Sequence, residues 1–493
     1  MTKLSVLSLT KQELLLILGF STFWIWTDLC FYGNAFTSFT AKTQVNPLIL
    51  QIIGVAAMAL SSGIVVVWPH KMKELLESRS IRIVLFTAIA IVTLMVPFSY
   101  GWLGLAAFVV FQSSVSLLAG LSIYVWVDQI AGTRLLFGPG ILIAGAITCG
   151  GAVVLAASLL CPEAELFVAV VQPLIGLILF EQISQKTKED KSAAMQTERS
   201  HDPDEKALAS HHGKTGLSWR FLVGLAVFSI AAGSSQLFTT SLDSGEIPLG
   251  MQAEFLARYI TAAVVFVGAC VFSWKPYPMF CVASLVTVGG FLALPFLPEH
   301  LRYIAPLLAN AGYTCLELMV WGVLFEAARA QDRLAISTVA SGRLIMASMA
   351  FIGVLVGASS GIWASGRDPM SAIASVIAYA IIAVTVLVLD ESRQKGSWHL
   401  AENSFANLEP KSDRITRCKE LSNEYGLTQR EREVLILLSE GRSVPFIAGE
   451  LGVAPSTITF HVRHIYDKLG VRSKNAIIDL VRSHDRPKPP CEL

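Results

Sequence analysis

The feature that most constrains this chain is a series of long apolar runs separated by polar breaks. A helix needs about 20 apolar residues to cross a bilayer core about 30 Å thick. Backbone N–H and C=O groups inside lipid must find partners within the protein, so each run is predicted to be helical. Such runs lie near residues 14–36, 48–68, 81–100, 102–125, 137–160, 165–183, 219–240, 252–274, 278–297, 301–325, 335–363 and 370–389. The sequence therefore predicts an all-α bundle of twelve transmembrane helices, six on each side of a polar central segment.

The composition agrees with a chain that lies mostly in a membrane. Of the 493 residues, 53% are apolar and only 15% are charged, whereas soluble proteins average about 25% charged residues. The net charge of +1 excludes a chain that is polybasic or polyacidic throughout. A small module can still concentrate charge locally, so nucleic-acid binding by part of the chain is not excluded. Membrane lipids are the expected surroundings of the twelve helices.

The distribution of Lys and Arg predicts the orientation of the bundle. With the N-terminus inside, the short inner segments hold ten basic residues and the central segment holds seven. The outer loops hold only Lys42, Arg302 and Arg367. Loops rich in Lys and Arg stay in the cytoplasm, so both chain ends are predicted to be cytoplasmic.

The predicted boundaries follow from the changes in hydropathy. They are a first membrane half at 1–183, a cytoplasmic loop at 184–217, a second half at 218–390, a connector at 391–425, a small soluble domain at 426–485 and a tail at 486–493. Two six-helix halves joined by a long cytoplasmic loop resemble the major facilitator fold. Transporters of that fold usually carry a Gly-Asp-Arg-Arg type signature after the second span, whereas this chain has WPHKMKELLESRSIR there. This departure weakens the case for transport and leaves a binding cavity possible.

The soluble domain has the pattern of a helix-turn-helix. Thr428 and Glu431 have the spacing of a capping box, in which each side chain caps a free backbone amide of the other. A short helix ends near Gly441, a second ends at Gly452, and a longer helix is predicted over 455–469. The buried stripe of the longer helix is Ile458, Val462, Ile465 and Leu469. Residues 455–474 contain four basic side chains against one acidic, so positive charge is focused where a recognition helix would meet DNA.

Residues 427–477, LTQREREVLILLSEGRSVPFIAGELGVAPSTITFHVRHIYDKLGVRSKNAI, resemble the LuxR/NarL-type DNA-binding domain. The resemblance implies a bacterial transcription regulator with a four-helix domain that binds double-stranded DNA. It implies base contacts from Thr459, Phe460 and Arg463, although the family often has Lys where Thr459 stands. Arg463 has the planar fork that suits guanine. Phosphate contacts are expected from Ser456, Thr457, Lys468, Arg472 and Lys474, which would set register and affinity.

The last helix of such domains pairs two copies on a two-fold DNA site. The residues expected to make this homodimer contact are Ile477, Ile478, Leu480 and Val481. A single module with little net charge would bind DNA weakly, so dimerisation is the expected route to affinity.

Ionisable residues within the spans are candidates for a ligand cavity, because stranding a charge in lipid costs several kcal/mol. Asp28 lies in the first span, Glu317 in the tenth and Arg343 in the eleventh. They are predicted either to line a polar cavity or to form buried structural ion pairs. Glu254 and Arg258 are four residues apart and are expected to satisfy one another on one helix.

No catalytic set stands out in the sequence. A Ser-His-Asp group, a phosphate-binding loop and a cysteine spacing typical of zinc sites are all missing, so no enzyme, cofactor or metal is predicted.

These observations favour a membrane-tethered one-component transcription regulator in the bacterial inner membrane. An unidentified small molecule would act on the membrane part and control promoter binding by the C-terminal domain. Two alternatives stay open. One is a major facilitator-type transporter with an appended regulatory module, and the other is tethered DNA binding that needs no ligand.

Overall fold

The computed structural model divides the chain into two compact units. A membrane unit contains Met1–His201 and His212–Asn407, and a C-terminal unit contains Asp202–His211 and Leu408–Leu493. Each is described by itself. The structure describes residues 9–32, 47–133, 137–198, 217–242, 249–272, 276–298, 301, 303–330, 334–359, 369–391, 404, 411–439, 447–448, 451, 453, 455–471, 477 and 480–481.

The first half of the membrane unit contains the six expected spans. They are α1 (Lys11–Tyr32), α3 (Pro47–Val67), the two parts of α5 (Arg79–Gly132), α6 (Pro139–Ser158) and α7 (Pro162–Glu198). The two spans in α5 meet at Gly104, whose φ of 76° is favourable only for glycine. The short helix α4 (Pro69–Glu77) follows α3 after a bend of 102°.

The second half contains six more helices. They are α8 (Trp219–Leu242), α9 (Leu249–Phe272), α10 (Pro276–Ala293), α11 (Ile304–Ala330), α12 (Ala335–Ser359) and α13 (Pro369–Glu391), and the 3-10 turn η2 (Leu294–Phe296) follows α10. Within the described residues, eight helices are long and apolar enough to span a membrane, α3 with α4 is a bent ninth candidate, and three shorter apolar helices complete the set. The prediction of an all-helical bundle is confirmed.

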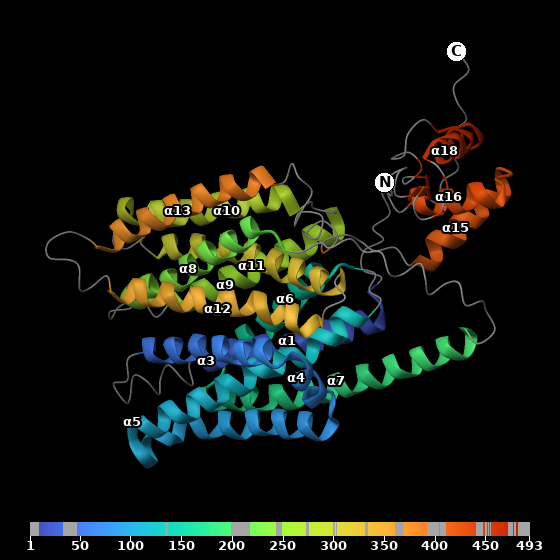
Figure 1. Cartoon of the computed structure of the whole chain (residues 1–493). Coiled ribbons are helices and arrows are strands. Elements are labelled where there is room, and N and C mark those ends of the chain that lie inside the picture. The colour runs from blue at the N-terminus through green and yellow to red at the C-terminus, as the bar shows by residue number, and fades with distance from the viewer. Residues whose placement is uncertain are drawn as a thin grey trace. The chain divides into compact units, whose positions relative to one another are not determined.

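The two halves lie side by side, with the first half in blue to green and the second in green to orange (Figure 1). Helix α3 packs on α12, and α6 packs on both α9 and α11, so helices from both halves form the interface. In the second half, α8 and α12 approach closely through Gly233 and Gly353. A methyl group on either glycine would lie about 2 Å from a carbonyl oxygen of the facing helix. Small residues permit such close packing of membrane helices.

The start of α1 is tied to the loop before α6. Thr10 and Glu13 form a reciprocal capping box, with a backbone amide of each bonded to the side chain of the other at 2.9 and 3.1 Å. Glu13 also accepts a hydrogen bond from the backbone N–H of Phe137 at 3.0 Å. These bonds satisfy free amides at the helix end and fix where the first span begins.

Two segments differ from the boundaries expected from hydropathy. Helix α7 continues beyond residue 183 to Glu198, into the segment predicted as a cytoplasmic loop. Residues Lys411–Glu424, predicted to belong to a connector, form helix α15. Cys418 and Leu421 of α15 are fully buried in the core of the C-terminal unit. The low hydropathy of this helix concealed it in the sequence.

The C-terminal unit consists of helices around a small apolar core. Helix α15 packs on α16 (Gln429–Ser439), and α16 packs on α18 (Pro455–Leu469), while residues 447–448, 477 and 480–481 are also helical. The predicted stripe of Ile458, Val462, Ile465 and Leu469 is buried, as expected. The predicted ends at Gly441 and Gly452 lie outside the described residues.

The capping box of α16 is confirmed and also holds α18. The carboxylate of Glu431 accepts a bond from the Thr428 amide at 2.8 Å, and the Glu431 amide bonds to the Thr428 hydroxyl at 3.3 Å. The ammonium of Lys468 in α18 lies 2.7 Å from the same carboxylate. Burial alone would raise the pKa of Glu431, but the bonds from Lys468 and Thr428 outweigh it and hold this pKa below its usual value.

We expect Glu431→Gln to separate these two roles. Glutamine still closes a capping box but loses the ion pair, so the free energy of unfolding of fragment 408–493 should fall by about 1–2 kcal/mol at pH 7. A carboxylate with a depressed pKa stabilises the fold above its unfolded pKa of about 4.3. Its contribution is lost as the pH falls through the lower folded value.

The measurement is urea unfolding of both proteins between pH 7 and pH 3. The difference between wild type and variant should shrink below about pH 4.5. A difference that stays constant over this range would show that the ion pair does not carry the effect.

Candidate ligand site and DNA-binding surface

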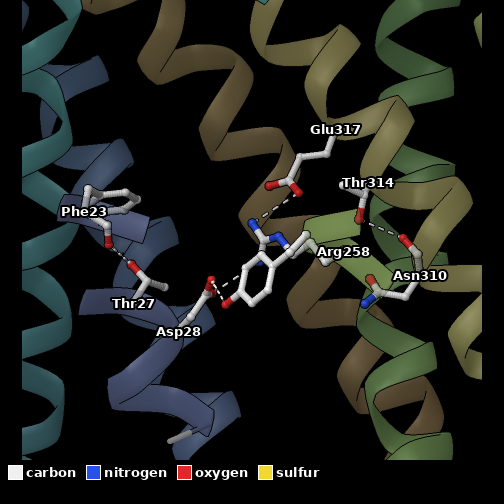
Figure 2. Close-up of polar contacts among 8 residues, drawn as sticks. Phe23, Thr27, Asp28, Arg258, Asn310, Thr314 and Glu317 are labelled. Carbon is white, nitrogen blue, oxygen red and sulfur yellow. Dashed lines mark hydrogen bonds and ion pairs between the residues drawn. The ribbon is translucent and has the colours of Figure 1, made fainter. Parts of the chain in front are cut away.

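A charge cluster lies between the two halves of the membrane unit. It consists of Asp28 in α1, Arg258 in α9 and Glu317 in α11, and is called the central charge cluster below. The guanidinium of Arg258 lies 3.4 Å from Asp28 Oδ1 and 3.4 Å from Glu317 Oε2. Figure 2 shows Arg258 between the two carboxylates. Asp28 comes from the first half and the other two from the second, so the cluster joins the halves.

Asp28 has further support from its neighbours. The Tyr259 hydroxyl donates a hydrogen bond to Asp28 Oδ2 at 2.8 Å, and the Asp28 residue is only 2% exposed. The guanidinium of Arg258 also lies over the ring of Trp24, 4.9 Å from its centre. A buried charge is tolerated when it is paired and hydrogen-bonded. Asp28 and Glu317 thus fit the expectation of buried structural ion pairs. For Arg343, the expectation that it lines a polar cavity stays open.

From the sequence, Arg258 was expected to pair with Glu254 on the same helix and not to join this cluster. The side chain of Glu254 lies outside the described residues. The contact with Asp28 joins residues 230 positions apart, which no local spacing reveals. An arginine within the eighth apolar run was the one available signal, because such a charge needs a partner within the bundle.

Arg343 in α12 lies in a cage of aromatic rings. Its guanidinium carbon is 5.4 Å from the ring centre of Phe23, 5.9 Å from Tyr124 and 5.8 Å from Trp321. The residue is 5% exposed. We call these four residues the arginine cage. Phe23 and Tyr124 belong to the first half and Trp321 to the second, so the cage also lies between the halves.

A cavity of about 720 Å³ opens between the halves at the end of the bundle where α1 begins and α13 ends. We call this the connector end, and the cavity the connector-end cavity. Helices α4, α5 and α7 line it from the first half, and α11 and α12 line it from the second. Its charged lining residues are Lys73, Glu77, Arg82, Asp128 and Arg329. Its volume is within the range of small-molecule pockets.

The charged lining of this cavity is partly neutralised by ion pairs. Arg82 is bound to Glu181 at 2.6 Å, which joins α5 to α7. Arg329 lies 3.1 Å from Glu326 and also donates to the Ile130 carbonyl oxygen. The cavity therefore has a polar opening that suits small molecules with both polar and apolar parts.

The exposed face of α18 carries the residues predicted to contact DNA. Ser456, Thr457, Thr459, Phe460 and Arg463 are all exposed, opposite the buried stripe. Phe460 is 58% exposed, and its ring lies 4.2 Å from that of His464 on the same helix. An exposed basic and aromatic helix face of this kind fits insertion into a DNA groove.

The other predicted residues of this unit have different positions. Lys468 is already paired with Glu431, so its ammonium is less available to phosphate than expected. Ile477, Leu480 and Val481 are buried in the core of the unit itself, so a dimer contact through the last helix would need its other residues. Arg472, Lys474 and Ile478 lie outside the described residues. No group of His, Cys, Asp or Glu able to hold a metal occurs among the described residues.

We expect Arg258→Met to destabilise the membrane unit strongly. The change leaves Asp28 and Glu317 buried without their shared cation, and breaking a buried pair in this way costs about 3–5 kcal/mol. The triple variant Asp28→Asn, Arg258→Met, Glu317→Gln removes all three charges and should recover most of the loss. The measurement is the thermal unfolding midpoint of the full chain in detergent. Equal midpoints for the single and triple variants would contradict this role of the cluster.

The two units are similar to different known proteins. The luxR family of bacterial regulatory proteins matches residues 426–481. The probable transcriptional regulatory protein NarL from two strains of Mycobacterium tuberculosis, CDC 1551 and H37Rv, is 52% identical over 52 residues. This match covers 10% of the present chain and 24% of each relative's length.

The membrane unit is similar in fold to a solved transporter. The proton:xylose symporter XylE of the major facilitator superfamily, bound to 6-bromo-6-deoxy-D-glucose, aligns with a TM-score of 0.51 at 11% identity. The alignment covers 77% of this chain and 94% of the symporter. At this identity the likeness concerns the fold alone. The chain thus joins a multi-pass membrane unit with the major facilitator fold to a C-terminal DNA-binding domain of the luxR family.

Proposed function

We propose that this protein is a membrane-tethered one-component transcription regulator. In this proposal a small molecule binds between the halves of the membrane unit and controls promoter binding by the C-terminal domain. The protein resides in the bacterial inner membrane with both chain ends in the cytoplasm, where the DNA is. The inside bias of Lys and Arg supports this orientation.

The observation that carries the proposal is the position of Ser404. This residue lies in the segment between α13 and α15, on the path of the chain towards the DNA-binding domain, and its side chain is completely buried. A methyl group on Gly322 of α11 would lie 2.6 Å from Ser404 Oγ and 3.2 Å from Gly140 Cα in α6. Ser404 therefore lies where a helix of each half meets.

This position links the arrangement of the halves to the connector. A ligand shifts the balance between two arrangements only by binding one of them more tightly. When α6 and α11 move apart or together, the space that holds Ser404 changes. The segment that continues to α15 then gains or loses its attachment, and the presentation or pairing of DNA-binding domains changes with it.

On DNA, α18 is the element proposed to enter the major groove. Thr459, Phe460 and Arg463 would read bases, while Ser456 and Thr457 would contact phosphate. Pairing of two copies would raise the affinity and impose a two-fold site. The exposure of these side chains supports their proposed roles.

We expect Arg463→Ala to reduce discrimination between DNA sequences. Loss of one bidentate contact to guanine should weaken binding to a duplex selected by the full-length protein by about 1–3 kcal/mol. Binding to random DNA should change much less. Lys419→Ala is the matched control, because it removes one exposed positive charge from α15. Fluorescence anisotropy with both duplexes measures the effect, and equal losses in the two variants would count against base reading by Arg463.

The proposal as a whole is tested with Gly322→Ala in a promoter reporter strain. The added methyl group should displace Ser404 and change the reporter output at unchanged protein level, and Arg463→Ala should abolish the output. Gly289→Ala is the control, because a methyl group at this helical position meets nothing within 4 Å. If both glycine variants behave like wild type, coupling through Ser404 is refuted. Uptake or efflux of a compound that survives deletion of 408–493 would favour a transporter instead.

A further inference from the structure

Arg343 is a buried cation that its own protein leaves incompletely satisfied. Its Nη1 has no hydrogen-bond partner among the described residues, and no ion pair joins it to a carboxylate in that part of the chain. A guanidinium has five N–H donors. The three aromatic rings of the cage attract the cation, but they accept hydrogen bonds poorly.

Two further donors in the same cluster are also unsatisfied. The indole N–H groups of Trp24 and Trp321 are buried without an acceptor in the described structure. The two rings contact each other at right angles, with their centres 6.2 Å apart, and Trp321 also borders Arg343. Buried donors of this kind are rare and need an explanation. All three groups are donors, so the group that would complete them is an acceptor.

The connector-end cavity leads towards these donors. Ala328 in α11 and Ile336 in α12 line the cavity. Trp321 and Arg343 are each seven residues away on the same helices, which places them on the same faces about 10 Å deeper. Tyr124 lines the cavity and also forms one wall of the arginine cage. The arginine cage therefore borders the cavity at Tyr124.

We propose that the arginine cage binds the carboxylate of a small aromatic acid that enters through the connector-end cavity. Arg343 and the indole N–H groups of Trp24 and Trp321 donate to the carboxylate, and the surrounding rings pack on the apolar part of the ligand. A planar guanidinium matches a planar carboxylate through two parallel bonds. This inference rests on the proposed function and names the class of its ligand.

The charges of the central charge cluster bear on how Arg343 would bind an anion. Asp28 and Glu317 share the cation Arg258, and Arg343, which interacts electrostatically with Glu317, balances the second carboxylate. The affinity of the site for an anion therefore depends on the positive charge of Arg343. A neutral analogue of the same shape lacks this attraction, so the site should discriminate between an acid and its amide.

The test uses the purified full chain in lipid nanodiscs, with phenylacetate as the probe and phenylacetamide as its neutral match. Quenching of tryptophan fluorescence should saturate with phenylacetate, and the amide should bind at least about tenfold more weakly. Arg343→Gln should lose phenylacetate binding. Arg79→Gln, which removes an exposed charge that does not line the cavity, should bind like wild type. Trp321→Phe replaces the indole by a smaller aromatic ring without the N–H and should bind the acid more weakly. It also serves as the milder variant should Arg343→Gln unfold.

Several outcomes would overturn the proposal. They are no saturable response to phenylacetate in the wild type, equal binding of acid and amide, or undiminished binding by folded Arg343→Gln or Trp321→Phe. The reporter strain distinguishes this proposal from the broader one. Phenylacetate binding without any reporter response would refute sensing and leave the acid site intact. A reporter response to neutral compounds that persists in Arg343→Gln would refute the acid site and leave sensing intact.

Discussion

One guanidinium in the interior of the membrane unit holds charges from both halves together. Arg258 of the second half lies between Asp28 of the first half and Glu317 of its own half. Charges buried in an apolar bundle must be compensated locally, because no water is available to solvate them. Any rearrangement that separates the halves must therefore break, move or replace this cluster. In the proposed function, a ligand would select between two arrangements of this interface.

The second requirement of the bundle is close contact between backbones. Gly233 and Gly353 bring α8 and α12 together, and Gly322 creates the space that Ser404 fills between α11 and α6. These are contacts of fixed size, since a single methyl group is enough to disturb them. Gly322 and the central charge cluster lie between the halves, so a small displacement of one half against the other disturbs both. Ser404, on the path of the chain towards the DNA-binding domain, lies at one of these contacts.

Much of the architecture could be predicted from local patterns. The apolar runs predicted the spans because length and hydropathy suffice in lipid. The capping box at Thr428 and the stripe of α18 were predicted because their spacing is set by helix geometry. Helix α15 was missed because its sequence is polar, although Cys418 and Leu421 are buried. The partners of Arg258 and the buried position of Ser404 were missed because they depend on contacts between residues distant in the sequence, which periodicity does not encode.

The orientation of the connector-end cavity has a consequence for what such a regulator can detect. The cavity opens at the end of the bundle from which the chain continues to the DNA-binding domain. In the proposed orientation, with both chain ends in the cytoplasm, the opening would face the cell interior. A compound that fills the cavity would then already have been imported or made inside the cell. The regulator would then respond to the concentration of the compound inside the cell, which uptake and metabolic turnover set, and not to its concentration outside.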